Sequence, residues 1–405
     1  MGLPRPLRSK KVWVPLLLVG LLVTGAGVYV KFLREDSSPA SQNNQAAESQ
    51  DSKEQPVTDP NTIRIIATGD FIAHDAINAQ AKRADGTYDY LQFMTDMQPA
   101  FEASDIRFCN QATLGGGTAY GISGYPVFNA PLEWTRDMAS LGCNVINTGT
   151  NHTNDKGQGP ITAELNEWDE QENILAVAGA NRSAAEQNMV RYFTVKGVKF
   201  AFLSYSTYVN SPNPNPYSLN RFSEPLVTSQ MTEARAKSDI IIVSMRWGTE
   251  YSPGINEAQN RDAAKLASLG ADIILGHGPH VLEPVKMLPG KDGRETLVWF
   301  SLGNFLNAQL ETEGLIGCLA DVSIDVLTKK LTGTSCLPIY QHYEWTAEQK
   351  AREDLLARKN FKLAPLETAK DLLADSQLDT TVEIQTERIN KLINTYTKVS
   401  ITSSQ

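Results

Sequence analysis

The sequence lacks an excess of basic residues: its 405 residues include 37 Lys and Arg against 46 Asp and Glu, a formal net charge of −9. Binding to nucleic acid needs a basic face, so nucleic acid is not expected as a partner. Cysteine and histidine are also scarce, with four and five residues, and no cysteines are spaced as in CxxC or other zinc motifs. A cysteine-based zinc site is therefore not expected. The apolar content of 41% is that of a globular protein with a sizeable core.

Charge is also missing from one long stretch near the N-terminus. Val12–Val30 contains no charged residue, and at about 1.5 Å per helical residue it approaches the thickness of a bilayer core. Residues 1–11 carry four basic side chains and are expected in the cytoplasm by the positive-inside rule. The chain is thus predicted to be a single-pass protein of the cell membrane whose main domain is extracytoplasmic. A cleaved signal peptide is the alternative, but its apolar region would be shorter, and Thr24–Gly27 is a poor cleavage site.

Residues 31–60 are rich in Ser, Gln, Asn, Ala and charge and have no apolar period, so we interpret them as a disordered linker. The folded domain is expected over residues 61–342, followed by a helical C-terminal extension over 343–405. An extracytoplasmic location permits disulfides. Cys318 and Cys336 could pair across a hairpin centred on Leu327. The alternative, which we favour, is that all four cysteines are small core residues.

Seven short apolar, β-branched runs end in polar residues. They are Ile63–Thr68, Ile106–Cys109, Asn144–Ile146, Lys199–Leu203, Asp239–Val243, Asp272–Leu275 and Thr296–Phe300. Helical patterns between several of them, such as Ala258–Leu269, predict a mainly parallel or mixed sheet covered by helices. Ligands of such sheets bind outside the carboxyl ends of the strands. The polar residues at these ends therefore favour a binding site over ordinary loops.

Two of these units resemble each other. ASLGCNVINTGTNH (Ala139–His152) and ASLGADIILGHGPH (Ala267–His280) each contain a helix end, a Gly, a strand, a loop and a His. Gly suits the left-handed position that follows a helix. Two halves of a layered fold could thus direct His152 and His280 at one point. Chance similarity of two common αβ units is the alternative.

Imidazoles and a carboxylate gather at the predicted strand ends. His152, His277 and His280 lie in loops that follow strands, and Asp70 ends another strand. Mixed nitrogen and oxygen ligands suit Mn, Fe or Zn better than Mg or Ca, which prefer oxygen alone. His74, four residues after Asp70, is a weaker candidate ligand.

Five ordered motifs give the chain a resemblance to the CapA family of capsule and poly-γ-glutamate synthesis proteins, over roughly residues 63–340. The motifs are Gly69-Asp70, Thr150-Asn151-His152-Thr153-Asn154-Asp155-Lys156-Gly157, Arg246-Trp247-Gly248-Thr249-Glu250-Tyr251, Gly276-His277-Gly278-Pro279-His280 and Ser301-Leu302-Gly303-Asn304-Phe305. The family has the fold of calcineurin-like metallophosphoesterases. The resemblance therefore implies an α/β fold built as a four-layer αββα sandwich.

The resemblance also implies a metal centre and a role in capsule or cell-envelope polymer biosynthesis. One or two divalent ions would be held by Asp70, Asn151, His152, His277 and His280. The candidate catalytic residues are Asp70, His152, His280 and Arg246. The candidate substrate contacts are Arg246, Trp247, Glu250, Tyr251, Asn110 and Asn304. Metal ions would polarise a phosphoryl oxygen and activate a water, as in a hydrolase. The expected partners are an anionic envelope polymer or its precursor, the membrane, and capsule-synthesis proteins.

Two positions depart from the family pattern. Ala112 stands where the family's Asn-x-Glu element has its Glu, and Arg246 stands where the family has a His before Trp-Gly. Alanine has no ligand atom, and a guanidinium is a fixed cation that only donates hydrogen bonds. A complete two-metal centre is therefore not expected.

Three interpretations of these departures remain open. In the first, Asp70, His152 and His280 hold one metal, while Arg246 binds a phosphate or carboxylate through two hydrogen bonds. In the second, the site binds an anionic envelope polymer without cleaving it. In the third, hydrogen bonds alone fill the site, and Arg246 pairs with Glu250 or Asp70.

Two neighbouring features each allow two roles. Asp155 either accepts from an imidazole or caps the following helix, and we favour the cap. The loop Asn210–Tyr217 alternates Pro with polar residues and either borders the site or is a passive connection. In the C-terminal extension, helices are predicted over Ala347–Arg358, Leu366–Asp375 and Val382–Tyr396.

Overall fold

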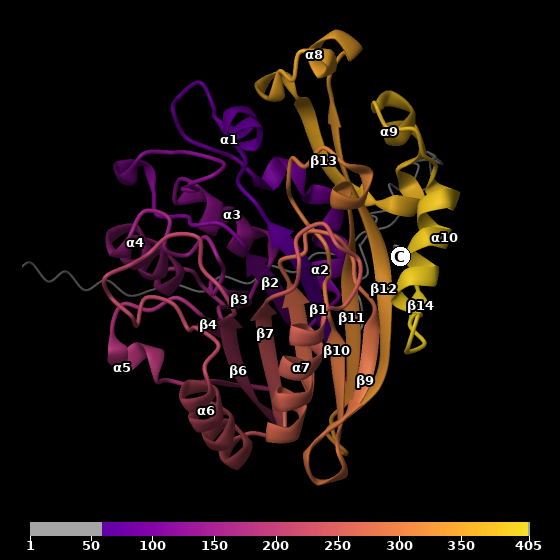
Figure 1. Ribbon diagram of the computed structural model, residues 1–405. Coiled ribbons are helices and arrows are strands. Elements are labelled where there is room, and N and C mark those ends of the chain that lie inside the picture. Colours follow the sequence, from indigo (N-terminus) through magenta and orange to yellow (C-terminus); the bar gives the residue numbers. More distant parts are fainter. Residues whose placement is uncertain (1–58, 404–405) are drawn as a thin grey trace, which may run out of the picture. The chain divides into compact units, whose positions relative to one another are not determined.

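The structure, a computed structural model, describes residues 59–403 (Figure 1). The predicted cytoplasmic tail, the anchor Val12–Val30 and nearly all of the linker lie outside the described residues. Between residues 59 and 403, no helix is long and apolar enough to cross a membrane.

Two mixed β-sheets form the centre of the described part. The first sheet has the strand order β13 (Lys359–Pro365), β12 (Lys330–Glu344), β11 (Ile316–Asp325), β1 (Thr62–Phe71), β2 (Ile106–Gln111), β3 (Val145–Asn147) and β4 (Ala176–Ala178), with β14 (Ser400–Ile401) beside β12. The second has the order β5 (Arg191–Val195), β6 (Val198–Ser206), β7 (Ile240–Arg246), β8 (Ile273–His277), β10 (Glu295–Trp299) and β9 (Val285–Pro289). All seven predicted strands are confirmed, as β1, β2, β3, β6, β7, β8 and β10.

The parallel strands of each sheet lie side by side. Strands β1 to β4 pair in parallel in the first sheet, and β6, β7, β8 and β10 do so in the second. The remaining long strands pair antiparallel at the edges. In each sheet the polar ends of the parallel strands therefore meet along one edge.

Alternating side chains of the second sheet enter two different apolar cores. In β6, Phe200 and Phe202 pack against the first sheet, whereas Ala201 and Leu203 pack against helices α6 (Glu224–Lys237) and α7 (Glu257–Leu269). A strand that is buried on both faces has a continuous run of apolar residues in its sequence, and β6 has such a run. The rings of Phe108 in β2 and Phe202 in β6 lie 6.0 Å apart, so the two sheets are in contact.

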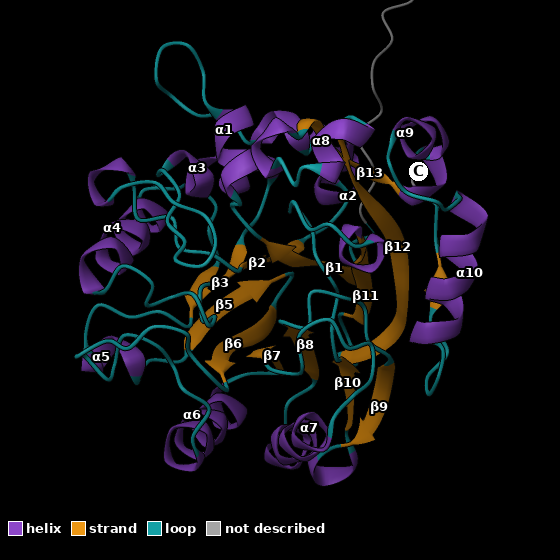
Figure 2. Ribbon diagram, turned by 45° about the horizontal axis from the view of Figure 1, so that its top comes forward, coloured by secondary structure: helices purple, strands orange, loops and turns teal. Residues whose placement is uncertain are grey.

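Helices also cover the outer face of the first sheet. They are α1 (Asp75–Ala81), α2 (Gln98–Glu102), α3 (Glu133–Leu141) and α4 (Gln158–Asp169), with the short α5 (Ala184–Gln187) following β4. Figure 2 shows the sheets between α6 and α7 on one side and α1 and α3 on the other. The described part is thus a mixed α/β sandwich of two sheets between helices, as predicted.

The C-terminal region differs from the expected helical extension. Helices α8 (Ala347–Ala351), α9 (Lys370–Asp375) and α10 (Val382–Ile393) fall within the predicted helical segments. However, β13 and β14 both pair with the edge of β12 that faces away from β11, so residues 343–403 also extend the first sheet. The buried alternation of Phe361 and Leu363 that marks β13 is too short to distinguish from a loop in the sequence.

All four cysteines are paired. Cys109 at the end of β2 bonds to Cys143 before β3, and Cys318 in β11 bonds to Cys336 in β12, with Cα separations of 5.8 and 5.6 Å. The favoured interpretation as unpaired core residues was wrong, and the pairing of Cys318 with Cys336 is confirmed. Cys109 and Cys143 lie on neighbouring parallel segments, a proximity that no turn in the sequence announces.

Candidate functional site

A buried hydrogen-bonded chain joins the polar ends of the two sheets. Asn110 on β2 donates through Nδ2 to Oδ1 of Asp70 on β1, and Asn147 on β3 donates to Oδ1 of Asn110 at 2.6 Å. The Nδ2 atom of Asn147 also lies 3.1 Å from Nε2 of His277 on β8, which is 2.7 Å from the hydroxyl of Ser244 on β7. The strand ends of both sheets therefore form one site.

His277 is a neutral, buried member of this chain. Because an amide nitrogen only donates, Nε2 of His277 accepts from Asn147, and the ring proton is on Nδ1. Burial lowers the pKa of His277 to about 3, although the charge of Asp70 acts in the opposite direction. Its Nδ1 atom lies 3.9 Å from Oδ1 of Asp70 and has no hydrogen-bond partner within residues 59–403.

Asp70 and His280 form a carboxylate–imidazole pair. Oδ2 of Asp70 lies 2.7 Å from Nδ1 of His280, which is also 3.2 Å from Oδ1 of Asn304. Burial would raise the pKa of the Asp70 carboxyl, but the hydrogen bond and charge of His280 and the charges of His277 and Arg246 lower it below its ordinary value. The carboxylate stays ionised and leaves Nε2 of His280 as the ring nitrogen available to a ligand.

A close backbone approach supports this pair. Asp70 forms a bridge with Asn304, and its amide donates to the carbonyl of Gly303 at 3.0 Å. A Cβ atom on Gly69 would lie 2.2 Å from that same carbonyl oxygen. Only glycine therefore fits beside the Ser301–Phe305 loop, which explains the Gly-Asp at the start of the motif series.

His152 belongs to a second carboxylate–imidazole pair. Its Nδ1 atom lies 2.6 Å from Oδ2 of Asp155, which also accepts from the amide of Phe128 at 2.7 Å. The other oxygen of Asp155 accepts from Ser211 at 3.1 Å, and Nε2 of His152 lies 3.2 Å from Nδ2 of Asn210. The favoured role of Asp155 as a helix cap was wrong: α4 begins after Gly157 without a side-chain cap. The loop Asn210–Tyr217 borders the site.

Arg246 is held by protein groups at every nitrogen. Nε donates to Oδ1 of Asn151 at 2.7 Å, Nη1 to the carbonyl of Trp247 at 3.2 Å, and Nη2 to Oε1 of Glu250 at 3.0 Å. The guanidinium also lies 4.5 Å from the ring centre of Tyr208, and the side chain is only 2% exposed. A two-hydrogen-bond clamp on a ligand would have to displace Glu250. The expected pairing of Arg246 with Glu250 is present.

The bond to Arg246 fixes the orientation of the Asn151 amide. Because Nε of arginine can only donate, the oxygen of Asn151 must face it. Nδ2 of Asn151 then points the other way, is buried, and has no hydrogen-bond partner in the described part of the chain. Asn151 thus offers an unused donor and has no free oxygen.

A cavity of about 440 Å³, here called the strand-end cavity, opens above these groups. It is lined by Ile72, His74, Ala112, Thr113, Tyr125, Phe128, Asn151, His152, Tyr208, Asn210, Glu250, Tyr251, His280 and Gln309. The twin αβ units do bring His152 and His280 to one place: Gly142 and Gly270 both end their helices in the left-handed conformation, and both histidines line the cavity. Arg246 lies behind Asn151, Tyr208 and Glu250.

Several predicted substrate contacts lie elsewhere. Trp247 packs in the outer core, where its Nε1 donates to the carbonyl of Phe300 at 2.8 Å. Asn110 and Asn304 are buried and hold Asp70 and His280 instead of lining the cavity. Glu250 and Tyr251 do line it.

Other lining residues were missed by the sequence analysis or rated weakly. His74 lines the cavity, but its Nδ1 accepts from the amide of Ala308 at 3.1 Å, and burial with the charge of Arg358 lowers its pKa to about 3. Tyr208, Phe128 and Thr113 come from loops without a recognisable motif. The only sequence signal for this part of the cavity was the Pro-rich composition of the neighbouring loop Asn210–Tyr217.

The residues present do not fit a two-metal centre. In residues 59–403, no group of three or more His, Cys, Asp and Glu side chains is arranged to hold a metal ion. Asn151, an expected ligand, gives its oxygen to Arg246, and Ala112 supplies no ligand atom. The guanidinium would also repel a cation at this position. What remains is the pair Asp70 and His280 with the unpartnered Nδ1 of His277.

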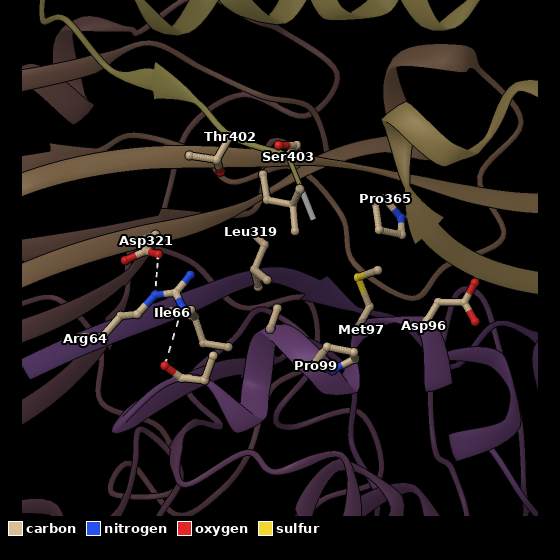
Figure 3. Close-up of a pocket in the computed structure, with 13 residues that line it drawn as sticks. Arg64, Ile66, Asp96, Met97, Pro99, Leu319, Asp321, Pro365, Thr402 and Ser403 are labelled. Carbon is tan, nitrogen blue, oxygen red and sulfur yellow. Dashed lines mark hydrogen bonds and ion pairs between the residues drawn. The ribbon is translucent and has the colours of Figure 1, made fainter. Parts of the chain in front are cut away.

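A second cavity lies on the first sheet, and none of the motif residues lines it. It has a volume of about 330 Å³, and Figure 3 shows Met97, Pro99 and Leu319 lining it. Its arginine, Arg64, pairs with Asp321 at 2.6 Å. These charges neutralise each other, so this cavity does not gather the polar groups that the strand-end cavity does.

Comparison with known proteins matches most of the sandwich to one family. The family model described as bacterial capsule synthesis protein PGA_cap matches residues 64–309. The PGA biosynthesis protein CapA of Bacillus subtilis is 30% identical over 239 residues, which are 56% of this chain and 58% of that protein. The capsule biosynthesis protein CapA of Bacillus anthracis is 26% identical over 188 residues, 44% of this chain and 43% of that protein. The chain thus spans about half the length of the curated relatives it matches.

Solved structures show more distant similarity. A phosphatase from Mycoplasma pneumoniae is 14% identical, with a TM-score of 0.43 over 69% of this chain and 94% of that one. A hypothetical protein from Thermus thermophilus is 12% identical, with a TM-score of 0.40 over 68% of this chain and 98% of that one. Similarity at this level does not indicate a function.

Proposed function

Since the chain belongs to the family of bacterial capsule synthesis proteins described as PGA_cap, we propose that it binds an anionic envelope polymer, or its precursor, in the strand-end cavity. Binding would serve the assembly of a capsule of the poly-γ-glutamate or polysaccharide type. The charge-free stretch Val12–Val30 and the basic residues before it support anchoring in the cell membrane, with this domain outside the cytoplasm.

The Asn151 amide carries this proposal. A buried donor without a partner costs about 1–3 kcal/mol, so its persistence indicates a ligand that accepts a hydrogen bond. Thr113 adds a second donor, because its oxygen accepts from the amide of Ala73 at 3.1 Å and its proton is then free for a ligand. Carboxylate and phosphate oxygens are the strongest acceptors that such a site can meet.

Arg246 supports the same interpretation as a positioning residue. It binds the oxygen of Asn151 through Nε and supplies a fixed positive charge next to this lining residue. In a metal centre that oxygen would be the ligand atom. Here the guanidinium takes both the oxygen and the place of the second cation, which favours an anion over a metal ion in the cavity.

The test uses the full-length protein in detergent. We expect a γ-linked glutamate oligomer or inorganic phosphate to bind, measured by titration calorimetry, while elemental analysis finds no stoichiometric metal. Arg246→Lys keeps the charge but loses the planar fork, so it should weaken binding about 10-fold or more. Arg136→Lys, on the surface in a pair with Glu167, is the matched control and should bind as the unmodified protein does. Binding that is absent at millimolar ligand, or that requires a metal ion, would refute the proposal.

A metal-dependent hydrolase is the second candidate, favoured by one observation. Among residues 59–403, the buried Nδ1 atom of His277 has no hydrogen-bond partner. The buried Oδ2 atom of Asp70 has none there either, apart from its ion pair with His280. No three such side chains are already arranged for a metal in residues 59–403, so Asp70, His277 and His280 would have to shift, and the His277 ring proton would have to move from Nδ1 to Nε2, to hold a single divalent ion such as Mn, Fe or Zn. Such an ion polarises a phosphoryl oxygen and activates water. Stoichiometric metal and phosphodiester hydrolysis, both lost in His280→Ala, would favour this candidate over the binding protein.

A further inference from the structure

A larger cavity adjoins the strand-end cavity. A cavity of about 700 Å³, here called the outer groove, shares His74 and Tyr125 with the strand-end cavity. It runs between α1 and the short helix Leu355–Ala357, two segments far apart in the sequence. Its lining also includes Ala76, Ala79, Tyr88, Ile122, Leu355 and Leu356. A ligand held in the strand-end cavity could therefore extend past Tyr125 into a second compartment.

Exposed apolar side chains concentrate along this path. Leu355 and Leu356 are 43% and 61% exposed, and Tyr125 is 78% exposed. Tyr251, at the mouth of the strand-end cavity, is 58% exposed. Large apolar side chains that border connected cavities mark a binding surface more often than isolated ones do. The outer groove is therefore suited to hydrocarbon.

Charge argues against a second anionic segment in the outer groove. Its three carboxylates, Asp75, Glu353 and Asp354, outnumber its two cations, Lys82 and Arg358, so the lining carries one net negative charge. Arg358 keeps its charge, but its Nε donates to the carbonyl of Leu355 and its Nη1 to that of Ala308, so these groups are already engaged with the protein. The outer groove thus offers a polyanion no net attraction.

We propose that the precursor is lipid-linked: a phosphate-headed amphiphile whose head occupies the strand-end cavity and whose hydrocarbon chain lies in the outer groove. This inference rests on the proposed binding of an anion. Phosphate suits the head because it offers more acceptor oxygens than a carboxylate to the donors Asn151, Thr113 and Asn210. The chain would pass Tyr125 and contact Leu355 and Leu356.

The experiment measures how affinity depends on chain length. Ethyl, butyl, hexyl and octyl phosphate are titrated, below their critical micelle concentrations, into the full-length protein in detergent, beside inorganic phosphate. Full burial of a methylene is worth about 0.8 kcal/mol, so affinity should rise about two- to fourfold per added carbon. The double variant Leu355→Ser, Leu356→Ser should lose this dependence. Leu327→Ser is the control for detergent effects, because Leu327 is 83% exposed at the β11–β12 turn, and should keep the dependence.

Failures of the two proposals give different results. If inorganic phosphate binds but affinity is flat with chain length, the lipid is refuted and anion binding stands. If octyl phosphocholine, with its neutral head, binds as tightly as octyl phosphate, the chain is held without a phosphate site and the lipid-linked assignment is refuted. If the double variant and the Leu327→Ser control keep equal slopes, the outer groove is not the place of the chain. If neither inorganic phosphate nor alkyl phosphates bind, anion binding itself is refuted.

Discussion

Replacing Asn151 by Asp separates anion binding from metal binding more sharply than any other single change. The side chains have the same shape, so Oδ1 can still accept from Arg246 Nε. The unpartnered nitrogen, however, becomes a carboxylate oxygen. Asn151→Asp thus converts the unpartnered donor of a residue that lines the strand-end cavity into an acceptor with negative charge.

The expected effects on stability and on binding differ. The attraction between the new carboxylate and Arg246 is worth about 4 kcal/mol at an effective dielectric of 20. Desolvation of the carboxylate costs several kcal/mol, so the two nearly cancel and the free energy of unfolding should change by only about 1 kcal/mol. An anionic ligand loses a hydrogen bond of about 1.5–3 kcal/mol and meets a like charge. The hydrogen bond alone corresponds to about 10- to 100-fold in Kd, and repulsion raises the expected loss above 100-fold.

The assay compares phosphate affinity, metal content and urea unfolding in Asn151→Asp and in the unmodified protein. Asn188→Asp, at an exposed position after α5, controls for the added charge and should change none of the three. A carboxylate is a better ligand for divalent ions than an amide. If Asn151 is a metal ligand, Asn151→Asp should keep or gain metal. Metal uptake, or a change in phosphate Kd of less than threefold, would show that the reasoning from the unpaired Asn151 nitrogen is wrong.

Three further predictions concern buried groups away from that amide. Burial raises the pKa of Glu164 to about 8 from an ordinary 4.5, so its carboxyl destabilises the fold increasingly as pH rises from 4.5 to 8. In urea unfolding, Glu164→Gln should therefore raise the free energy of unfolding by up to about 5 kcal/mol at pH 9 and leave it unchanged at pH 4. Removing the disulfide with Cys109→Ala and Cys143→Ala, 34 residues apart, should lower the free energy of unfolding by about 3–4 kcal/mol; an unchanged urea midpoint would contradict this. Asp155→Asn should weaken phosphate binding about 10-fold and change the His152 tautomer in ¹⁵N NMR spectra; an unaltered tautomer would show that Asp155 does not position the ring.

The strands and the site edge could be predicted from the sequence because their signals are local. Each buried strand is a short apolar run that ends at a polar residue, and parallel strands bring these ends together. The equal spacing from Gly142 to His152 and from Gly270 to His280 reflects two helix ends in the same left-handed conformation. Such features follow from a few neighbouring residues.

The interactions that decide the chemistry were less accessible, because they depend on long-range contacts. That Arg246 Nε meets Asn151 Oδ1 depends on the packing of two different sheets, and the residues are 95 positions apart. Asp155 is an exception, because its partner His152 is only three residues away: two local roles compete for the same carboxylate, and the sequence does not decide between them. The Cys109–Cys143 pairing likewise depends on β2 lying beside β3.

The loss of metal ligands and the gain of Arg246 are best understood as one electrostatic change. The buried carboxylate of Asp70 must be neutralised, and its lowered pKa reflects His280, His277 and Arg246 acting against burial. A divalent ion about 4 Å from the guanidinium of Arg246 would be repelled by about 8 kcal/mol at an effective dielectric of about 20. This is twice the repulsion that a singly charged ion would meet. Such a site favours the opposite sign of ligand. Under the proposed function, Arg246 would therefore make a framework of carboxylate–imidazole pairs accept an anion in place of a cation, without altering the sheets that position it.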